Sequence, residues 1–184
     1  ITGPAGSGKS THAKMLARKF SLHYISGGDL ARKKAADNSE EGKAVKEAIE
    51  TGRLIDDEVE ARLVSNEIEK SPEKYVLDGF PRSLHQLGYL EPDIDAVIIM
   101  EVPDEEVKRR LLKRGRADDT PEAIEERLQI FHDLTAPVID YFTGKGREII
   151  KIDGLRDKIS VEQEIEGHFS CQSIEGSLSG ENKL

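Results

Sequence analysis

Near its N-terminus the chain reads Gly3-Pro4-Ala5-Gly6-Ser7-Gly8-Lys9-Ser10. This stretch matches the pattern G-x-x-x-x-G-K-S/T, whose glycines allow successive backbone N–H groups to point at a bound phosphate. A helix predicted to begin at Lys9 directs its positive end at the same anion. A chance glycine turn is the alternative, but the stretch lies between strand-like Ile1-Thr2 and a helix, as a phosphate loop requires. We therefore predict a nucleotide phosphate site in which Lys9 binds the β- and γ-phosphates and Ser10 can ligate Mg²⁺.

Short apolar runs alternate with helical patterns along the rest of the chain. Buried strands are predicted at 23–25, 75–77, 96–102 and 148–152, with Ile1-Thr2 as the end of a fifth. Helices are predicted at 9–20, 40–51 and 57–70, and a long one follows a Thr120 cap and is kinked at Pro137. Alternating strands and helices imply an α/β fold with right-handed crossovers. We expect a P-loop, three-layer fold in which helices flank a five-stranded parallel sheet.

The composition argues against several classes of protein. The chain has 184 residues and a net charge of −9, so it lacks the overall basic charge of a nucleic-acid-binding protein. Its apolar runs are far shorter than the roughly 18 residues of a membrane-spanning helix. One cysteine, Cys171, allows neither a disulfide framework nor a cysteine zinc site, and the histidines lack ligand spacing. We expect a single domain in a reducing, cytoplasmic compartment, with no nucleic-acid or membrane partner.

The two ends of the chain differ from its middle. The sequence begins at Ile1 rather than Met, so we expect further residues before it. The last segment, 167–184, is rich in Ser and Gly and has little periodicity. We predict that this segment is a flexible tail without a role in chemistry.

A second motif, Asp78-Gly79-Phe80-Pro81-Arg82, follows the apolar run at 75–77. Ligands of open α/β sheets collect at the carboxyl ends of the strands, which is where Asp78 is predicted to lie. Asp78 can hold Mg²⁺ through water, and the planar guanidinium of Arg82 can bind an acceptor phosphate. The alternative is an ordinary Asp-Gly turn with a surface arginine. The pairing of a carboxylate with a guanidinium indicates phosphoryl transfer between two nucleotides.

Basic residues gather in the segment Lys108-Arg109-Arg110-Leu111-Leu112-Lys113-Arg114-Gly115-Arg116. On a helix, Arg110 and Arg114 share one face, and Arg116 follows the end of that helix. Arg127 lies in the next predicted helix. Solvated helix faces often carry such residues, and we accept that interpretation for Lys108, Arg109 and Lys113.

In this order, the motifs resemble those of an adenylate kinase, a nucleoside monophosphate kinase of the short-lid type. The resemblance covers residues 1–166. It includes the phosphate loop, Ser26-Gly27-Gly28-Asp29-Leu30-Ala31-Arg32, Gly52-Arg53-Leu54-Ile55, the 78–82 motif with Gln86, the R-x-x-x-R-G-R-x-D-D run at 110–119, and Ile152-Asp153-Gly154. It implies a reversible, Mg²⁺-dependent transfer of the γ-phosphoryl group of ATP to AMP, which gives two ADP and balances the adenine nucleotide pools.

The resemblance assigns the donor nucleotide to the phosphate loop and to two later segments. The residues implied to bind ATP are Pro4, Ala5, Gly6, Ser7, Gly8, Lys9, Ser10, Thr11, Arg110, Gly154 and Arg156. Among these, Arg110, Gly154 and Arg156 are implied to enclose the adenine. The candidates for Mg²⁺ remain Ser10 and Asp78.

The resemblance assigns the acceptor nucleotide to the first helices and the 78–82 motif. The residues implied to bind AMP are Gly27, Arg32, Arg53, Leu54, Ile55, Gly79, Arg82, Gln86, Arg116 and Arg127. Of these, Arg32 and Arg82 are implied to hold the phosphate, and Gln86 to recognise the adenine edge. The catalytic residues are implied to be Lys9, Arg82, Arg114, Arg116 and Arg127, with Asp118 and Asp119 orienting the arginines.

The chemistry of this reaction agrees with the assignment. An AMP phosphate oxygen is already anionic, so the main obstacle is repulsion between polyanions, and no general base is needed. Water must also be excluded, so two mobile parts are expected. The resemblance implies one kinase domain at 1–166, whose parts are a core (1–26, 57–114, 128–166), an NMP-binding insertion (27–56) and a short lid (115–127). Short-lid members are often monomers, so we expect a monomer.

Three departures from the family pattern affect the expected site. The lid is too short to carry the larger lid domain and zinc ligands of many bacterial members, so we expect no zinc. Ser10 stands where many members have glycine. Gly27 replaces a common Thr and Ala31 a common Leu, which loosens the pocket for the acceptor base.

Two other functions remain open at this point. One is a UMP/CMP kinase of the same fold. Gln86 argues against it, since such relatives tend to carry Asn there, whereas Gly27 supports it. The other is a non-catalytic nucleotide-binding protein, which would not need the full set of Lys9, Arg82, Arg114, Arg116 and Arg127.

Overall fold

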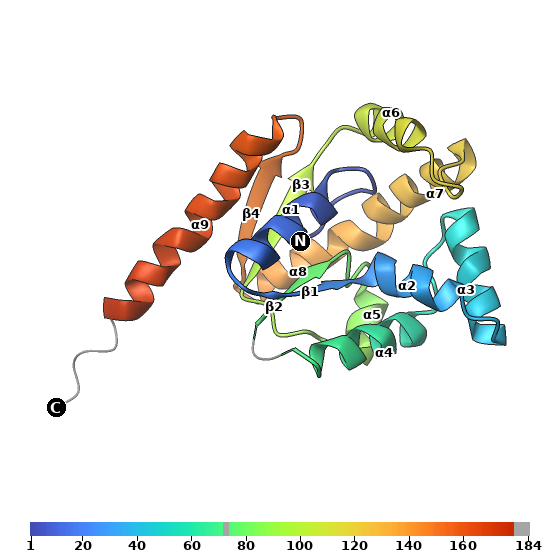
Figure 1. Ribbon diagram of the computed structural model, residues 1–184, viewed down its shortest axis with the longest axis horizontal. Coiled ribbons are helices and arrows are strands. Elements are labelled where there is room, and N and C mark those ends of the chain that lie inside the picture. The colour runs from blue at the N-terminus through green and yellow to red at the C-terminus, as the bar shows by residue number, and fades with distance from the viewer. Residues whose placement is uncertain (72–73, 179–184) are drawn as a thin grey trace.

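The structure is a computed structural model that describes residues 1–71 and 74–178 (Figure 1). Its strands are β1 (His23–Ser26), β2 (Tyr75–Asp78), β3 (Ala96–Glu101) and β4 (Glu148–Asp153). Its helices are α1 (Lys9–Lys19), α2 (Gly27–Ala35), α3 (Glu40–Thr51), α4 (Asp57–Ile68), α5 (Leu84–Tyr89), α6 (Asp104–Arg114), α7 (Pro121–Ile130), α8 (Ala136–Gly144) and α9 (Lys158–Leu178), with the π-helical segment η1 (Phe131–Thr135) between α7 and α8. The predicted α/β class is confirmed.

The strands form two parallel pairs, β1–β2 and β3–β4. In the first pair Ser26 lies beside Asp78, and in the second Glu101 lies beside Asp153. In each pair the two strands therefore end side by side, and the loops that follow them begin at the same edge of the sheet. In open α/β sheets this carboxyl edge is where ligands bind.

The N-terminal dipeptide lies between the two strand pairs. The amino group of Ile1 donates to the carbonyl of Leu77 at 2.6 Å. On the other side, the N–H of Thr2 donates to the carbonyl of Ile98 at 2.8 Å, and Thr2 forms a parallel bridge with Ile99. The structure therefore contains two two-stranded sheets and a bridge of two residues, rather than the single five-stranded sheet predicted from the sequence.

The side chains of β3 divide the core into two layers. Ile98 and Met100 pack against α1 and α9 on one face, whereas Val97 and Ile99 pack against α8 on the other. Such alternation follows from the two-residue period of a strand. Because both faces are covered, β3 reads as a continuous apolar run in the sequence. The helices thus form layers on both sides of the strands, as predicted.

Side-chain caps fix the starts of the helices that carry site residues. The hydroxyl of Thr120 accepts from the N–H of Ala123 at 3.1 Å, and Pro121 occupies the first helical position of α7, as predicted. Ser26 caps α2 and Ser83 caps α5 in the same way. Each cap satisfies an N–H group that the helix itself leaves without a partner.

The long helix predicted after Thr120 is interrupted earlier than expected. The sequence predicts a kink at Pro137, whereas the structure places η1 at Phe131–Thr135, just before it. The N–H of Ala136 donates to the carbonyl of Phe131, five residues back. Pro137 has no N–H to donate to residue 133, so the disturbance falls on the turn before the proline.

Helix α9 continues through most of the segment predicted to be a flexible tail. It runs along β4 and on to Leu178, so residues 167–178 are helical, and 179–184 lie outside the described residues (Figure 1). Val161 and Ile165 are buried against the core and anchor its first turns, from which a helix extends readily. No helix in the described ranges is both long and apolar enough to span a membrane.

Truncation of a core side chain on β4 should destabilise the fold. Ile152 is fully buried between α1 and α9, so Ile152→Ala should lower the free energy of unfolding by about 2–5 kcal/mol in urea titrations. The control is Ile159→Ala, because Ile159 is 67 % exposed on α9 and its loss should cost less than about 0.5 kcal/mol. Equal losses in the two variants would contradict this placement of the core.

Candidate active site

A cavity of about 410 Å³ opens at the carboxyl edge of the strands. Its walls come from the phosphate loop, from α2 and α3, and from the segment around α6 and α7. The predicted site residues that line it are Pro4, Ala5, Gly6, Gly8, Lys9, Ser10, Thr11, Arg32, Arg53, Leu54, Ile55, Gly79, Arg82, Arg114, Arg116 and Arg127. Residues separated by more than 100 positions in the sequence therefore face one space.

The phosphate loop leads into α1 without a side-chain cap. Gly8 precedes the helix with φ 94°, and no side chain accepts from the first N–H groups of α1. Gly3 has φ 143°, and a Cβ there would lie 2.7 Å from the carbonyl oxygen of Met100. The loop therefore packs against β3, and the uncapped helix start is open to an anion.

Lys9 is held inside the cavity by contacts at the base of the loop. Its Nζ donates to the carbonyl of Pro4 at 3.2 Å. Burial lowers the pKa of Lys9 to about 8, and the nearby positive charges of the arginines act in the same direction, while Asp78 opposes them. The ammonium is therefore poised to gain a favourable partner when an anion enters the cavity.

Asp78 ends β2 and lies close enough to Lys9 to affect the pKa of that lysine. It is buried, and its Oδ2 accepts from the hydroxyl of Tyr24 at 2.7 Å. Its other oxygen, Oδ1, is buried and has no hydrogen-bond partner within the described residues. An orphaned carboxylate oxygen beside a phosphate loop fits a water ligand of Mg²⁺, which keeps several waters in nucleotide sites.

Arg82 is fixed by its backbone as much as by its side chain. Its N–H donates to Oε1 of Gln86 at 2.7 Å, and its carbonyl accepts from the hydroxyl of Thr135 at 2.9 Å. The guanidinium Nε donates to the carbonyl of Gly79 at 2.6 Å and leaves the outer nitrogens toward the cavity. The side chain is thus preorganised to bind an anion.

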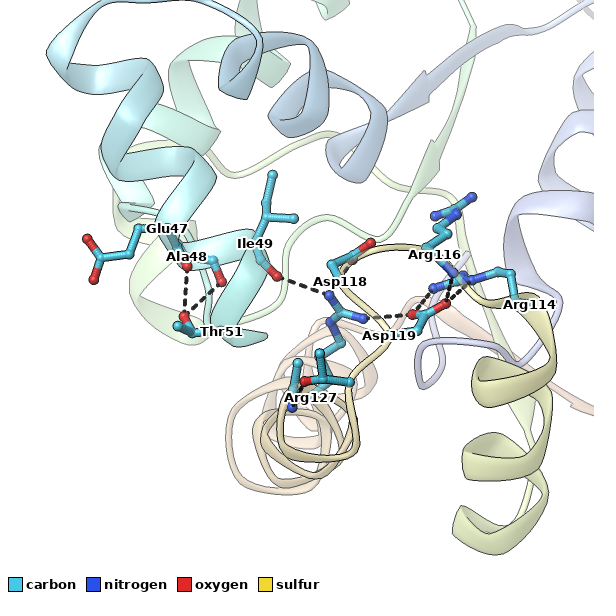
Figure 2. Close-up of polar contacts among 11 residues, drawn as sticks. Glu47, Ala48, Ile49, Thr51, Arg114, Arg116, Asp118, Asp119 and Arg127 are labelled. Atoms are coloured by element: carbon cyan, nitrogen blue, oxygen red, sulfur yellow. Dashed lines mark hydrogen bonds and ion pairs between the residues drawn. The ribbon is translucent and has the colours of Figure 1, made fainter.

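Asp119 gathers the arginines of the α6–α7 segment (Figure 2). Its side chain is fully buried and accepts from Arg114 at 2.9 and 2.6 Å, from Arg127 at 3.2 Å and from the backbone N–H of Arg116 at 3.1 Å. Burial acts to raise the pKa of Asp119, but these hydrogen bonds outweigh it and hold the pKa below its usual range. One carboxylate therefore orients the guanidinium groups of Arg114 and Arg127 and holds the backbone at Arg116.

Arg127 also joins α7 to α3 (Figure 2). Its Nη2 donates to the carbonyl of Ile49 at 3.1 Å and forms an ion pair with Asp118. Nearby, a Cβ on Gly52 would lie 2.4 Å from the carbonyl oxygen of Ala123, so the end of α3 touches the start of α7 directly. The two walls of the cavity are in contact in this state.

Among the arginines of the α6–α7 segment, Arg116 has the fewest partners for its positive charge. Within the described ranges, the structure gives its guanidinium neither a hydrogen bond nor an ion pair, although it lines the cavity. Burial, with the positive charges of Arg114 and Arg32, lowers the pKa of Arg116. Such a cation favours an anionic ligand.

Comparison with known proteins identifies the family. A model of the adenylate kinase family matches residues 1–147. The chain belongs to this family. Adenylate kinase of Stenotrophomonas maltophilia strain K279a is 36 % identical over 181 residues, covering 90 % of this chain and 95 % of the relative. Adenylate kinases of Kosmotoga olearia and Encephalitozoon cuniculi are each 34 % identical, covering 90 % of this chain and 95 % and 93 % of the relative.

Seven of the residues predicted for the site, from the motifs or from the resemblance to adenylate kinases, do not line the cavity. They are Ser7, Gly27, Asp78, Gln86, Arg110, Gly154 and Arg156. Arg110 and Gly154 nevertheless lie together, since Nη2 of Arg110 donates to the carbonyl of Gly154 at 2.9 Å. Gly154 packs on the phosphate loop, where a Cβ would lie 3.3 Å from the carbonyl oxygen of Ser7. Arg156 instead pairs with Glu164 on α9.

Two of the arginines predicted to bind the acceptor, Arg32 and Arg53, pair with residues of α2 and α3. Arg32 pairs with Asp29 one turn earlier on α2. Arg53 donates to the hydroxyl of Thr51 at 3.0 Å and to Glu47 at 3.3 Å. Both arginines line the cavity. Exposed pairs of this kind are weak, so a phosphate could displace these partners.

Two site residues were missed from the sequence. Glu60 on α4 lines the cavity although it is only 2 % exposed, and Thr135 on η1 holds the backbone of Arg82. Glu60 lies one helical turn before Val64, a core residue, so a charged residue on the apolar face of α4 was the available signal. The sequence around Thr135 gave no comparable signal, because the hydrogen bond from its hydroxyl to the carbonyl of Arg82 depends on the π-helical turn η1.

Removal of the Lys9 charge should stabilise the ligand-free protein at neutral pH. The unfolded chain holds this proton up to about pH 10.5, the folded chain only to about pH 8, so the charged ammonium opposes folding below pH 8. Lys9→Met should therefore raise the free energy of unfolding at pH 7, and its advantage should shrink as the pH rises from 8 to 10.5.

Urea unfolding of wild type and variant across this pH range measures the effect. The control is Lys113→Met on the exposed end of α6, which should change stability at pH 7 by less than about 0.5 kcal/mol. A Lys9→Met variant that is less stable than wild type at pH 7 would contradict the prediction.

Proposed function

We propose that this chain transfers the γ-phosphoryl group of ATP reversibly to AMP and gives two ADP, the reaction of the adenylate kinase family. The observation that carries the proposal is a cavity that the phosphate loop, with the uncapped start of α1, shares with six arginines. Three of them (Arg32, Arg53, Arg82) come from α2 and from the segments after α3 and β2, and three (Arg114, Arg116, Arg127) come from the α6–α7 segment. This arrangement supports two phosphorylated ligands rather than one.

The transfer needs one bond to form and one to break. A phosphate oxygen of AMP attacks the γ-phosphorus of ATP while the bond from that phosphorus to the β–γ bridging oxygen breaks. The electron pair of the broken bond stays on ADP, and the attacking oxygen carries no proton to remove. The residues therefore supply position and positive charge.

The cations divide this work among them. The helix start and Lys9 bind the donor phosphates, Arg82 and Arg32 hold the acceptor phosphate, and the cluster bound to Asp119 neutralises the group in transit. Because Asp119 fixes its arginines before substrate binds, little reorganisation is needed at the moment of transfer. The fully buried carboxylate of Asp119 thus acts as a positioning residue.

Mg²⁺ belongs to the family's reaction, and Asp78 and Ser10 are the residues proposed to hold it. Bound together with ATP, Mg²⁺ would supply positive charge that offsets the charge of the phosphates. Asp78 is suited through its unpartnered Oδ1, and Ser10 lines the cavity in the first turn of α1. The proposed donor base lies beyond the loop, against Arg110, Gly154 and Arg156.

The parts proposed from the sequence form one kinase domain. The core is 1–26, 57–114 and 128–166, the NMP-binding insertion is 27–56, and the lid is 115–127. The contact between Arg127 and Ile49 joins the lid to the insertion and supports their closing together over substrate. We further propose that Ile1-Thr2 belong to a central fifth strand, and that the protein is a cytoplasmic monomer.

The acceptor should be AMP. Purified protein with Mg·ATP should form ADP fastest with AMP in a panel of AMP, CMP and UMP, measured by coupled ADP detection. Comparable rates with CMP or UMP would favour the pyrimidine kinase interpretation. Absence of transfer to every monophosphate would indicate a nucleotide-binding protein without this activity.

Removal of the Arg82 guanidinium should affect catalysis far more than folding. Arg82→Ala keeps the backbone bonds to Gln86 and Thr135, so the fold should survive, whereas kcat with AMP should fall by about 10²–10³-fold. The matched control is Arg109→Ala, because Arg109 is exposed on α6 and pairs with Glu106. Near-normal turnover of Arg82→Ala would contradict the proposed role.

A further inference from the structure

Gln86 is fully occupied by the protein itself. Its side chain is 0 % exposed, its Oε1 accepts from the N–H of Arg82 at 2.7 Å, and its Nε2 donates to Oε2 of Glu60 at 2.8 Å. It does not line the cavity. Gln86 is therefore poorly placed to contact a nucleotide base, although the resemblance assigned it that role.

Glu60 stands between Gln86 and the cavity. Its Oε2 is fixed by Gln86, while its Oε1 has no hydrogen bond within the described residues and lies 4.0 Å from Nη2 of Arg82. Burial raises the pKa of Glu60, against the opposing effects of Arg82 and Gln86. Glu60 lines the cavity, and an oxygen there that accepts no hydrogen bond from the protein favours a ligand that donates to it.

Gly27 provides the space that this carboxylate occupies. A Cβ at Gly27 would lie 2.8 Å from Oε1 of Glu60 and 3.3 Å from the carbonyl oxygen of Gly79. Its backbone has no positive φ, so conformation does not explain the glycine. The Glu60 carboxylate on α4 therefore fits in its position because Gly27 on α2 has no side chain.

We propose that Glu60 recognises the acceptor base, by accepting a hydrogen bond from the exocyclic 6-amino group of adenine, and that Gln86 is a positioning residue that aims it. The inference rests on the proposed function and names the specificity determinant of that site. It replaces the loosened acceptor pocket expected from Gly27 with a pocket that contains a specific polar group.

The chemistry of the base edge makes this choice selective. Adenine presents an amino donor at C6, whereas hypoxanthine presents a carbonyl oxygen there, which a carboxyl oxygen repels. The ionised carboxylate can only accept, and Arg82 and the side-chain amide of Gln86 favour that form of Glu60. A site built to accept this hydrogen bond therefore rejects the 6-oxo base, because both acceptors would be left unpaired.

A different role for Glu60 is to hold Arg82 as its counter-ion. The 4.0 Å separation is outside hydrogen-bond range, and Arg82 is already fixed by Gly79. The two roles predict different results, because Arg82 is proposed to bind the phosphate that all acceptors share. Loss of a counter-ion would change the rates of all acceptors alike, whereas loss of base recognition changes their ratio.

The test compares kcat/KM for AMP with that for IMP, whose base carries the 6-oxo group. Purine riboside monophosphate, which has no group at C6, and GMP complete the panel. The variants are Glu60→Gln, Glu60→Met and the control Glu58→Gln, which makes the same change on the exposed face of α4. Circular dichroism and thermal unfolding establish that each variant is folded.

Wild type should prefer AMP to IMP by at least about ten- to hundredfold. In Glu60→Gln the new amide oxygen should accept from Gln86, which turns the amide N–H₂ toward the base, so the preference should shift toward IMP by tenfold or more. Glu60→Met keeps Gln86 covered. In this variant the kcat/KM values for AMP, IMP and purine riboside monophosphate should become similar. Glu58→Gln should leave the AMP-to-IMP ratio unchanged.

Three results would overturn the inference while wild type still phosphorylates AMP. The first is an unchanged ratio of kcat/KM for AMP to kcat/KM for IMP in both Glu60 variants. The second is an equal fall of kcat/KM for all acceptors in these variants, and the third is a wild-type preference for GMP. Failure of wild type to phosphorylate AMP at all would instead overturn the proposed function.

The Gly27 contact provides a second, independent test. Gly27→Ala places a methyl group against Oε1 of Glu60 and should lower the AMP-to-IMP ratio by displacing the carboxylate. Gly28→Ala is the control, because the three atoms nearest its Cβ would belong to the Arg32 side chain, the closest at 3.4 Å, and Arg32 is proposed to bind the phosphate that AMP and IMP share. An unchanged ratio in folded Gly27→Ala would contradict the arrangement.

Discussion

The site depends on carboxylates that offset the electrostatic repulsion between the positively charged side chains around one small cavity. Lys9, Arg82, Arg114, Arg116 and Arg127 converge there before any anion is bound. Like charges at such separations cost several kcal/mol unless carboxylates offset them. The buried side chain of Asp119 offsets the charges of Arg114 and Arg127, whereas burial, reinforced by neighbouring positive charges, lowers the pKa values of Lys9 and Arg116. A cavity lined by these partly desolvated cations therefore favours polyanionic ligands.

Sequence patterns predicted the scaffold well, because periodicity and caps act locally. The phosphate loop, the strands and the Thr120 cap all follow from residue types within a few positions of one another. The five-stranded sheet did not follow in the same way, since Ile1-Thr2 provide only a two-residue bridge between two pairs. The position of η1 also depended on geometry that Pro137 alone could not specify.

The residues that line the cavity were easier to predict than the orientation of their side chains. The motifs identified most of the cationic residues that line the cavity, because phosphate recognition requires those residue types. Gln86 was assigned to the base from the resemblance, yet three elements meet around it and use both ends of its amide. Glu60 was overlooked because an acidic residue on a helix is usually solvated. Only the packing of α2, α4 and α5 determines which of the two side chains faces the cavity.

The π-helical segment η1 sets the angular relation between two functions of one continuous helical stretch. Each residue of an α-helix turns the chain by about 100°, so one additional residue in the turn at Phe131–Thr135 rotates everything that follows. With this rotation, Arg127 on α7 faces the cavity, while Val138 and Phe142 on α8 face the core beside β3. An uninterrupted helix of the same length would direct one of these faces away from its partner. The irregular turn thus allows a single stretch of chain to serve both the catalytic cavity and the hydrophobic core.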